Sequence, residues 1–326
     1  MDNRAVSPHA STYTSLIRLL SFLGCLVVAA AAPGVASAME DVDQARNLLK
    51  KMAVANRERD YQGVFTYEHA GVLKSIRILH VVHDGLEFEH LLYLNGPHKE
   101  IIRRGIPPHC KRKGDRFLSG VPMPSRHASH LENHYELLLR GEDRVAGRAV
   151  KIIQVMPKDD LRYGYVLSVD KQSGLLLQSL LIGTNRRVME RFQYIDLSLE
   201  PDQDAVDELL GGPQTVASDC APGTTPAPTS WQAAWLPPGF EAVESSEDEE
   251  GNVVMSFSDG LSFVSVFVDS GGVIRFPDIQ AQRGATVAQH ANVIHDQKEF
   301  AICVVGEVPP ETAAKMAQFV QPQVRR

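Results

Sequence analysis

Alternation of apolar and polar residues with a period of two constrains this chain more than any other feature. The alternation recurs in runs that short turn-forming segments separate, such as Asn95-Gly96-Pro97 and Lys171-Gln172-Ser173-Gly174. A strand that buries one face shows this period, and short turns join antiparallel neighbours. The sequence therefore predicts a series of antiparallel strands over residues 61–68, 75–82, 86–94, 99–104, 148–156, 162–170, 174–182 and 187–197.

Helical periodicity appears between some of these runs. Apolar residues from Glu40 to Arg59 recur every three or four positions, as one buried stripe of a helix requires. Residues 129–140, which end at Gly141, and residues 204–210 show helical patterns as well. Strands and helices in this order predict an α+β fold, in which one curved antiparallel sheet is covered by helices on one face.

A change of composition divides the chain. Residues 211–230 are rich in Gly, Pro, Thr, Ala and Ser and have no hydrophobic period, which is typical of a linker. Behind the linker we expect strands over residues 252–258, 261–269, 287–295 and 299–306, and a helix that begins at Pro309-Pro310. The predicted domains are a signal peptide (1–38), an N-terminal domain (39–210), a linker (211–230) and a small C-terminal domain (231–326).

The N-terminus has the pattern of an export signal. Arg4 and Arg18 precede an apolar run over residues 19–32, and Ala36-Ser37-Ala38 supplies the small residues that a signal peptidase reads. We expect cleavage after Ala38 and a location in the periplasm. The alternative is an uncleaved membrane anchor, for which the run is short. A start codon downstream of Met1 is a further alternative, because the polar stretch before Arg18 is long.

Charge and cysteine content narrow the classes of function. The chain has 33 basic and 40 acidic residues, and removal of residues 1–38 leaves 31 and 39, a net charge near −8. A mildly acidic exported protein is not a general nucleic-acid binder. We expect Cys303, which lies in an apolar run, to be buried, whereas Cys110 and Cys220 flank polar loops and are candidates for a disulfide.

No sequence motif of a catalytic site is present: the chain lacks GxSxG, Walker, GxGxxG and HExxH patterns. His127, His130 and His134 would share one face of a helix and are the best candidate metal ligands. Charged neighbours favour the alternative of a solvated face. We therefore expect neither a metal nor a cofactor, and a binding protein rather than an enzyme.

Two sets of residues could bind a lipid. Basic side chains are concentrated from Lys99 to Arg116, in the strand predicted over residues 99–104 and in the segment that follows it. They could bind phosphates or an acidic peptide. The alternative is a solvated hairpin whose charges protect a sheet edge. Strand residues of the predicted sheet could line an apolar cleft for acyl chains, or form the core. The candidates for lipid and anion binding are Phe65, Tyr67, Phe88, Tyr93, Lys99, Arg103, Arg104, Lys111 and Arg112, with Lys113 and Arg116 in the same basic cluster.

An acidic run from Glu244 to Glu250 ends at Gly251. A run of like charges beside a glycine favours an exposed hairpin loop. Recruitment of a basic partner is the alternative function for this segment.

Several short blocks occur in an order that resembles the RseB/MucB family. The blocks are Leu94–Glu100, Arg162–Tyr165, Trp235–Phe240, Ser258–Leu261 and Val305–Pro310. The resemblance implies an N-terminal unclosed antiparallel β-barrel, similar to lipoprotein carriers, and a smaller α/β C-terminal domain. It also implies a periplasmic negative regulator of a sigma-E type (AlgU-type) stress response.

The resemblance further implies the partners. These would be the periplasmic segment of a single-pass, RseA/MucA-like anti-sigma factor, which the protein shields from proteolysis, and lipopolysaccharide or another acyl lipid, which releases it. A homodimer is a further possibility. The alternatives are a lipid carrier without a signalling partner, a histidine-dependent hydrolase or metalloenzyme, and an envelope scaffold. The candidate partner-binding residues are Trp231, Trp235, Pro237, Gly239, Phe240, Ser258, Asp259 and Gly260.

Overall fold

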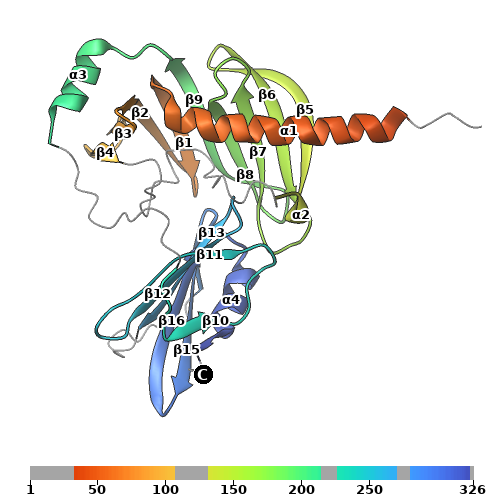
Figure 1. The fold of residues 1–326 in the computed structure, drawn as a ribbon, viewed down its shortest axis with the longest axis vertical. Helices are drawn as coiled ribbons and strands as arrows, with labels where there is room; N and C mark the ends of the chain where they lie inside the picture. Colours follow the sequence, from red (N-terminus) through yellow and green to blue (C-terminus); the bar gives the residue numbers. More distant parts are fainter. Residues whose placement is uncertain (1–32, 107–130, 214–225, 270–279, 324–326) are drawn as a thin grey trace, which may run out of the picture. The chain divides into compact units, whose positions relative to one another are not determined.

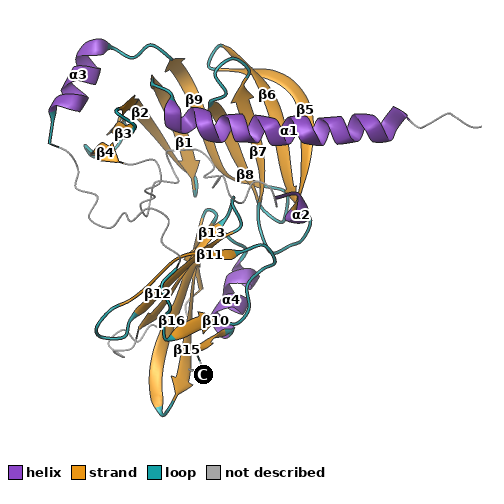
Figure 2. Cartoon of the chain, viewed as in Figure 1, coloured by secondary structure: helices purple, strands orange, loops and turns teal. Residues whose placement is uncertain are grey.

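Two large antiparallel sheets and one small two-stranded sheet are present in the described part of the protein (Figures 1 and 2). The computed structural model describes residues 33–106, 131–213, 226–269 and 280–323. The chain divides into two compact units, Met1–Glu40 and Asp41–Arg326, and all three sheets belong to the second. We call the residues of the nine-stranded sheet and its helices the N-terminal part, and those from Trp231 onward the C-terminal part.

The nine-stranded sheet has the strand order β4-β3-β2-β1-β9-β8-β7-β6-β5, and every adjacent pair in it is antiparallel. Its edge strands β4 and β5 are not paired with each other, so the sheet is unclosed over the described residues. This confirms the predicted fold class. The strands are β1 (Tyr61–His69), β2 (Val72–His83), β3 (Leu86–Tyr93), β4 (Glu100–Ile106), β5 (Tyr135–Val145), β6 (Arg148–Pro157), β7 (Gly164–Asp170), β8 (Leu176–Ile182) and β9 (Val188–Ser198).

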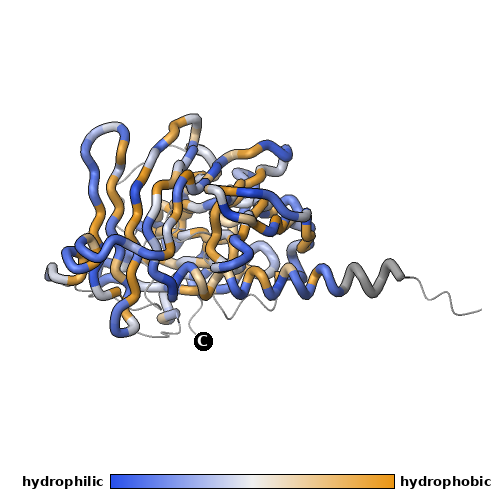
Figure 3. Tube along the Cα trace, turned by 90° about the horizontal axis from the view of Figure 1, so that it is seen from above, coloured by the Kyte–Doolittle hydropathy of each residue, from blue (hydrophilic) through white to orange (hydrophobic). Residues whose placement is uncertain are grey.

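Helix α1 (Pro33–Glu58) covers one face of this sheet with the part that follows Asp41. Ala45, Leu49 and Met52 are buried at helical spacing and belong to one apolar cluster with Phe65 of β1. The predicted stripe is therefore confirmed, and removal of this apolar surface from water stabilises the fold. The alternation of apolar and polar residues along the strands can be followed in Figure 3.

A second, smaller cluster lies on the opposite face of the sheet. Leu79 and Val81 of β2 have the opposite parity to Ile78, and they pack with Phe88 of β3 and Leu209 of helix α3 (Gln203–Gly211). The side chain of Asp202 accepts a hydrogen bond from the Ala205 amide and so caps α3. Helices therefore cover both faces of the sheet, whereas the sequence predicted cover on one face.

The predicted helix over residues 129–140 is wrong. Helix α2 spans only Leu131–His134, and the chain then continues as strand β5, which pairs with β6. Tyr135 and Leu137 are buried and Glu136 between them is exposed, so the period of two decides the structure here. Gly141, expected at a helix end, has φ 97° and lies where the register of β5 and β6 shifts.

The six-stranded sheet has the order β11-β12-β13-β16-β15-β14. Its strands are β11 (Glu241–Glu247), β12 (Val253–Ser258), β13 (Phe263–Asp269), β14 (Gln280–Arg283), β15 (Thr286–His295) and β16 (Lys298–Gly306). Helix α4 (Pro310–Gln318) covers one face, and β10 (Trp231–Ala233) pairs with β17 (Val320–Pro322). The acidic run was predicted as a loop, but its first half is edge strand β11 and only the turn before β12 is irregular.

Truncation of the helix stripe tests the packing of α1. We expect Leu49→Ala to lower the free energy of unfolding by about 2–5 kcal/mol, because it removes a fully buried side chain and leaves a cavity. Val54→Ala on the same helix, where the side chain is 51% exposed, should change it by less than about 1 kcal/mol. Chemical denaturation of both variants gives the two values, and equal losses would contradict the packing described.

Candidate functional site

The candidate site lies where turns of the C-terminal part meet the N-terminal part. Three segments share one end of the six-stranded sheet: the turn between β12 and β13, the turn between β14 and β15, and the segment after β16. Polar side chains of the N-terminal part contact all three. We call this set of contacts the docking site.

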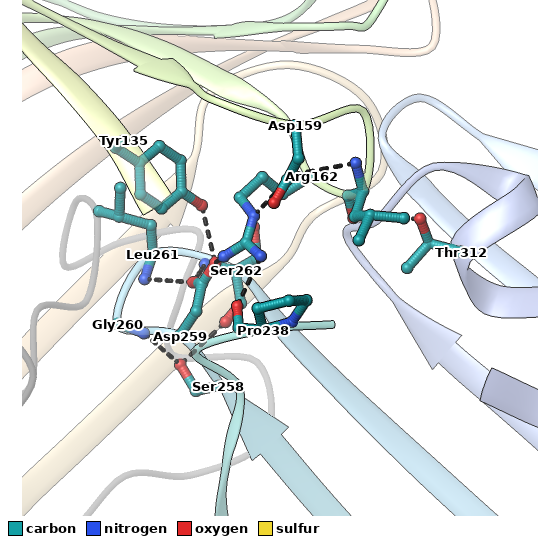
Figure 4. A network of polar contacts seen from close by, with 11 residues as sticks. Tyr135, Asp159, Arg162, Pro238, Ser258, Asp259, Gly260, Leu261, Ser262 and Thr312 are labelled. Atoms are coloured by element: carbon teal, nitrogen blue, oxygen red, sulfur yellow. Dashed lines mark hydrogen bonds and ion pairs between the residues drawn. The ribbon is translucent and has the colours of Figure 1, made fainter. Parts of the chain in front are cut away.

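Asp259, in the turn between β12 and β13, is at the centre of the docking site (Figure 4). Its Oδ2 accepts hydrogen bonds from the Tyr135 hydroxyl at 2.8 Å and from Arg162 Nη1 at 2.7 Å. Its Oδ1 accepts from the amides of Leu261 at 3.0 Å and Ser262 at 2.8 Å. One carboxylate thus holds its own turn and binds the N-terminal part.

Arg162, in the loop before β7, is completely buried, with 0% of its surface exposed. Besides Asp259, it donates from Nε to Asp159 at 3.0 Å and from Nη2 to the carbonyl of Pro238 at 2.6 Å. Burial opposes the charge, but the hydrogen bond to Asp159 and the charge of Asp259 outweigh it and raise the pKa of Arg162. Loss of one member of such a pair costs about 3–5 kcal/mol, since the other charge stays buried and unpaired.

Aromatic rings and backbone carbonyls complete this part of the site. The guanidinium carbon of Arg162 lies 5.5 Å from the ring centre of Tyr135 and 5.4 Å from that of Phe240. Burial and the charge of Asp259 raise the pKa of Tyr135, so its hydroxyl stays a donor. Tyr163 donates to the carbonyl of Val308 at 3.1 Å.

A second carboxylate, Glu190 of β9, binds the other turn. Its Oε2 accepts from the Tyr67 hydroxyl at 2.6 Å, and its Oε1 lies 2.8 Å from His69 Nδ1 and accepts from the Ala285 amide at 2.9 Å. Burial and the charge of Glu190 raise the pKa of Tyr67. A Cβ on Gly284 would lie 2.5 Å from His69 Nδ1, so the turn needs glycine to approach this closely.

Apolar contact accompanies the polar bonds. Leu261 and Ala285 of the C-terminal part are buried and belong to the same apolar cluster as the α1-covered face of the N-terminal part. The two turns therefore place side chains in the core of the other part of the chain.

The candidate partner-binding residues have internal contacts. Trp231 and Phe240 are buried in the C-terminal core, and Pro237, Ser258, Asp259 and Gly260 are buried as well. Ser258 Oγ donates to the Ser262 carbonyl at 2.8 Å and accepts from the Gly260 amide at 3.0 Å. Trp235 is half-buried, with Lys315 Nζ 4.0 Å from its ring centre, and Gly239 is exposed. Their role toward a partner stays a prediction.

The candidate apolar lipid-binding residues are not brought together on one face. Phe65, Tyr67 and Tyr93 lie on the α1-covered face, and Phe88 lies on the other with α3. Phe65 is fully buried, and Tyr67 and Tyr93 are half-buried.

The candidate basic residues make specific contacts where they are described. Lys99 Nζ lies 4.6 Å from the ring centre of Tyr93, and Arg103 binds Glu89 at 2.7 Å. Arg104 donates to the carbonyl of Leu209 at 2.8 Å. Some residues of the predictions lie outside the described residues: Lys111, Arg112, Lys113, Arg116, Cys110, Cys220, His127 and His130. Cys303 is half-buried, and burial raises the pKa of its thiol.

Within the described ranges, no group of three or more His, Cys, Asp and Glu side chains is placed to hold a metal ion. No helix in the same ranges is long and apolar enough to cross a membrane.

The sequence identifies Asp259 as a candidate binding residue, but it assigns Arg162 no role of its own. Asp259 and Arg162 both lie in blocks that the sequence singled out, but 97 positions separate them and nothing in either block indicates the pairing. Tyr135 was assigned to a helix, and Glu190 and His69 carried no signal beyond their strands.

Comparison with known families and proteins matches nearly the whole chain. The model of the MucB/RseB N-terminal domain matches residues 44–210, and that of the MucB/RseB C-terminal domain matches residues 225–321. The sigma factor AlgU regulatory protein MucB of Pseudomonas aeruginosa is 32% identical over 315 residues, which cover 94% of this chain and 97% of the relative. The sigma-E factor regulatory protein RseB of Escherichia coli K12 is 26% identical, with 84% and 89% covered.

Solved structures agree with these matches. The structure of the Pseudomonas aeruginosa MucA/MucB complex has a TM-score of 0.68 and 31% identity, and covers 86% of this chain and 100% of that chain. A crystal structure of MucB alone has a TM-score of 0.60 and 29% identity over 86% of this chain and 98% of that chain.

The close approach of Gly239 to His134 can be tested by adding one methyl group. A Cβ at Gly239 would lie 2.3 Å from the His134 ring, and the residue has φ 84°. Gly71 has φ 74° and open space around it, so Gly71→Ala provides the matched control for backbone strain alone. We expect Gly239→Ala to lower the free energy of unfolding by about 1–3 kcal/mol more than Gly71→Ala. Equal effects in chemical denaturation would contradict this contact.

The lowered pKa of His134 predicts that the protein loses stability on mild acidification. Burial and the charge of Arg162 lower its pKa from the ordinary 6.5, so the unfolded chain takes up this proton first as the pH falls. The free energy of unfolding should therefore fall between pH 6.5 and the lowered pKa. We expect His134→Gln to show a shallower decline across that window, measured by denaturation at several pH values. A slope identical to that of the unmodified protein would contradict the prediction.

Proposed function

The chain belongs to the MucB/RseB family, and we propose that it binds the periplasmic segment of a membrane anti-sigma factor and so holds a sigma-E type stress response off. The observation that carries this proposal is the match to MucB over nearly the full length of both chains, together with the solved complex of MucB with MucA(peri).

The proposed location is the periplasm. The apolar run before Ala38 and the small residues at the expected cleavage site support export through a signal peptide. Determination of the N-terminal residue of the protein from the periplasm tests the cleavage site.

Binding alone accounts for the proposed regulation. A bound protein shields the anti-sigma segment from the protease that starts its degradation, and no bond of a substrate is changed. Lipopolysaccharide or another acyl lipid would release the segment only if it binds the partner-free form more tightly than the bound form. The shift between the two forms needs an element with two arrangements, and the docking site between the two parts is the candidate.

We assign the main partner anchor to Trp235. Of the predicted partner-binding residues, it is the aromatic side chain that stays half-buried, with Phe319, 44% exposed, beside it at 6.4 Å between ring centres. Tryptophan side chains that become fully buried in an interface often dominate its binding energy. Trp231, Phe240 and Asp259 would act by holding the surface in shape.

Protease protection tests the function directly. The purified periplasmic segment of an anti-sigma factor should be digested more slowly when this protein is present, and added lipopolysaccharide should restore digestion. A chain that transfers lipid but forms no complex with any such segment would contradict the proposal and support a lipid carrier.

Trp235→Ala tests the anchor. We expect it to weaken binding of the anti-sigma segment at least about tenfold, because the substitution removes the aromatic ring at the centre of the proposed contact. Calorimetry measures the two affinities. Ile294→Ala removes a side chain that is 77% exposed elsewhere in the C-terminal part and should leave the affinity within about twofold. Equal losses for both variants would argue against the assignment of Trp235.

A further inference from the structure

We propose that three neighbouring hairpin tips at one end of the nine-stranded sheet form a docking surface for an anionic phospholipid bilayer. The tips are residues 70–74, where β1 turns into β2, residues 94–99, between β3 and β4, and residues 183–188, where β8 turns into β9. We call these residues the tip surface. The proposal concerns turns of the sheet and the face of a membrane, and so goes beyond the binding of an anti-sigma segment.

Strand pairing places the three tips side by side. In the sheet order β3-β2-β1-β9-β8, His69 at the end of β1 pairs with Val72 at the start of β2 and with Glu190 near the start of β9. The Leu94 amide donates to the Ser75 carbonyl at 2.8 Å, so the tip after β3 lies beside the start of β2. All three turns therefore leave the sheet at the same end.

Hydrogen bonds hold the tips in shape. Asn95 joins two of them, because its Oδ1 accepts from the Ser75 amide at 2.8 Å and its Nδ2 donates to the Leu73 carbonyl at 2.9 Å. In the third tip the Gly183 amide donates to the Arg187 carbonyl at 2.9 Å. The turn between β1 and β2 has positive φ at both central residues, as a type I′ turn requires. A surface held in this way loses little conformational freedom when it binds.

Each tip exposes aliphatic side chains. Val72 and Leu73 are 42% and 53% exposed, Leu94 is 43% exposed and Val188 is 45% exposed. These are four of the nine large apolar side chains that are exposed in the described ranges, although the tips are a small part of the chain. Exposed apolar side chains that gather at one place mark an interaction site, whereas scattered ones need no explanation.

The charges that accompany these aliphatic side chains are all basic. The chain has 33 basic and 40 acidic residues, but the tip surface has no acidic residue and four basic ones, namely Lys74, Lys99, Arg186 and Arg187. None of the four forms an ion pair with a carboxylate of the described residues. Asp84, in contrast, lies in the turn between β2 and β3 at the opposite end of these strands. The basic tip is therefore a local property of an acidic protein.

A bilayer fits this surface better than a peptide does. A peptide that binds a sheet uses an open strand edge or a groove, but β1, β2, β3, β8 and β9 are each paired on both sides. A bilayer accepts separate aliphatic side chains between its head groups, while its phosphates attract the basic side chains around them. The Debye length is about 8 Å at physiological ionic strength, so salt screens acidic residues elsewhere on the protein.

Membrane contact would support the proposed function by raising local concentration. The proposed partner is held in a membrane, and a protein confined to the same surface meets it more often than one that diffuses freely. This consequence rests on the proposed function, whereas the contact itself does not. The two can therefore be tested separately.

Flotation with lipid vesicles tests the contact on the purified mature chain, without any anti-sigma segment. We expect the chain to float with vesicles of equal parts phosphatidylglycerol and phosphatidylcholine, and to bind vesicles of phosphatidylcholine alone at least about tenfold more weakly. Sodium chloride at about 1 M, where the Debye length is about 3 Å, should remove this preference. Equal binding to both vesicles, or no binding to the anionic ones, would overturn the proposal and leave the proposed function intact.

Reversal of two charges tests the basic part of the tip surface. Arg186→Glu with Arg187→Glu should weaken binding to the anionic vesicles at least about tenfold. Lys50→Glu with Arg140→Glu is the matched control, since it reverses two exposed charges on α1 and β5 and should change binding less than about twofold. All four side chains are exposed, so both variants should fold. Equal losses would show that net charge, and not the tip surface, decides binding.

Removal of two aliphatic side chains tests the apolar part. Leu73→Ser with Leu94→Ser should weaken binding to the anionic vesicles at least about fivefold, because both side chains would leave water on docking. Ile195→Ser with Ile294→Ser removes two exposed aliphatic side chains outside the tip surface and should leave binding within about twofold. A tip variant that binds vesicles normally but loses affinity for an anti-sigma segment would assign the surface to that segment and overturn the proposal.

Hydrogen exchange locates the contact. Amides of residues 70–74, 94–99 and 183–188 should exchange more slowly when anionic vesicles are bound, and those of residues 84–85 at the opposite end should not change. Protection at residues 84–85, or unchanged exchange in all three tips, would place the membrane contact elsewhere and overturn the proposal.

Discussion

The buried ion pair between Arg162 and Asp259 is the interaction on which the arrangement of this protein depends. Both charges are out of water, so each requires the other, and the geometry satisfies them from several directions at once. Because Arg162 lies in the loop before β7 and Asp259 in the turn between β12 and β13, their mutual requirement fixes where a turn of the six-stranded sheet meets a loop of the nine-stranded sheet. A hydrophobic contact alone would allow many orientations, whereas this pair allows few.

Glu190 provides a second point of attachment between the two parts of the chain. It binds the second turn through the Ala285 amide while Tyr67 and His69 bind the carboxylate from the N-terminal part. Two separate points of attachment restrict rotation as well as distance. The Asp259 turn and the Gly284-Ala285 turn are therefore held by two different carboxylates, each of which satisfies partners in both parts of the chain.

Much of the fold could be predicted from the sequence, because strands that bury one face must alternate and most of these strands do. The prediction failed at residues 135–140, where adjacent leucines satisfy the helical spacing as well as the period of two, and only pairing with β6 decides between them. Strand β11 was missed because most of its side chains are exposed and are either glutamate or serine, so it carries no apolar alternation. The docking site could not be predicted, since no local pattern encodes a partner 97 positions away.

The order of the two charged residues along the chain has a consequence for biogenesis. Arg162 precedes Asp259, so during synthesis the guanidinium leaves the ribosome before the carboxylate that pairs with it. The loop before β7 therefore cannot bury the Arg162 charge together with this partner until the turn between β12 and β13 has formed. A chain that stops short of β12 therefore lacks the Asp259 carboxylate, and the Arg162 guanidinium loses this buried partner.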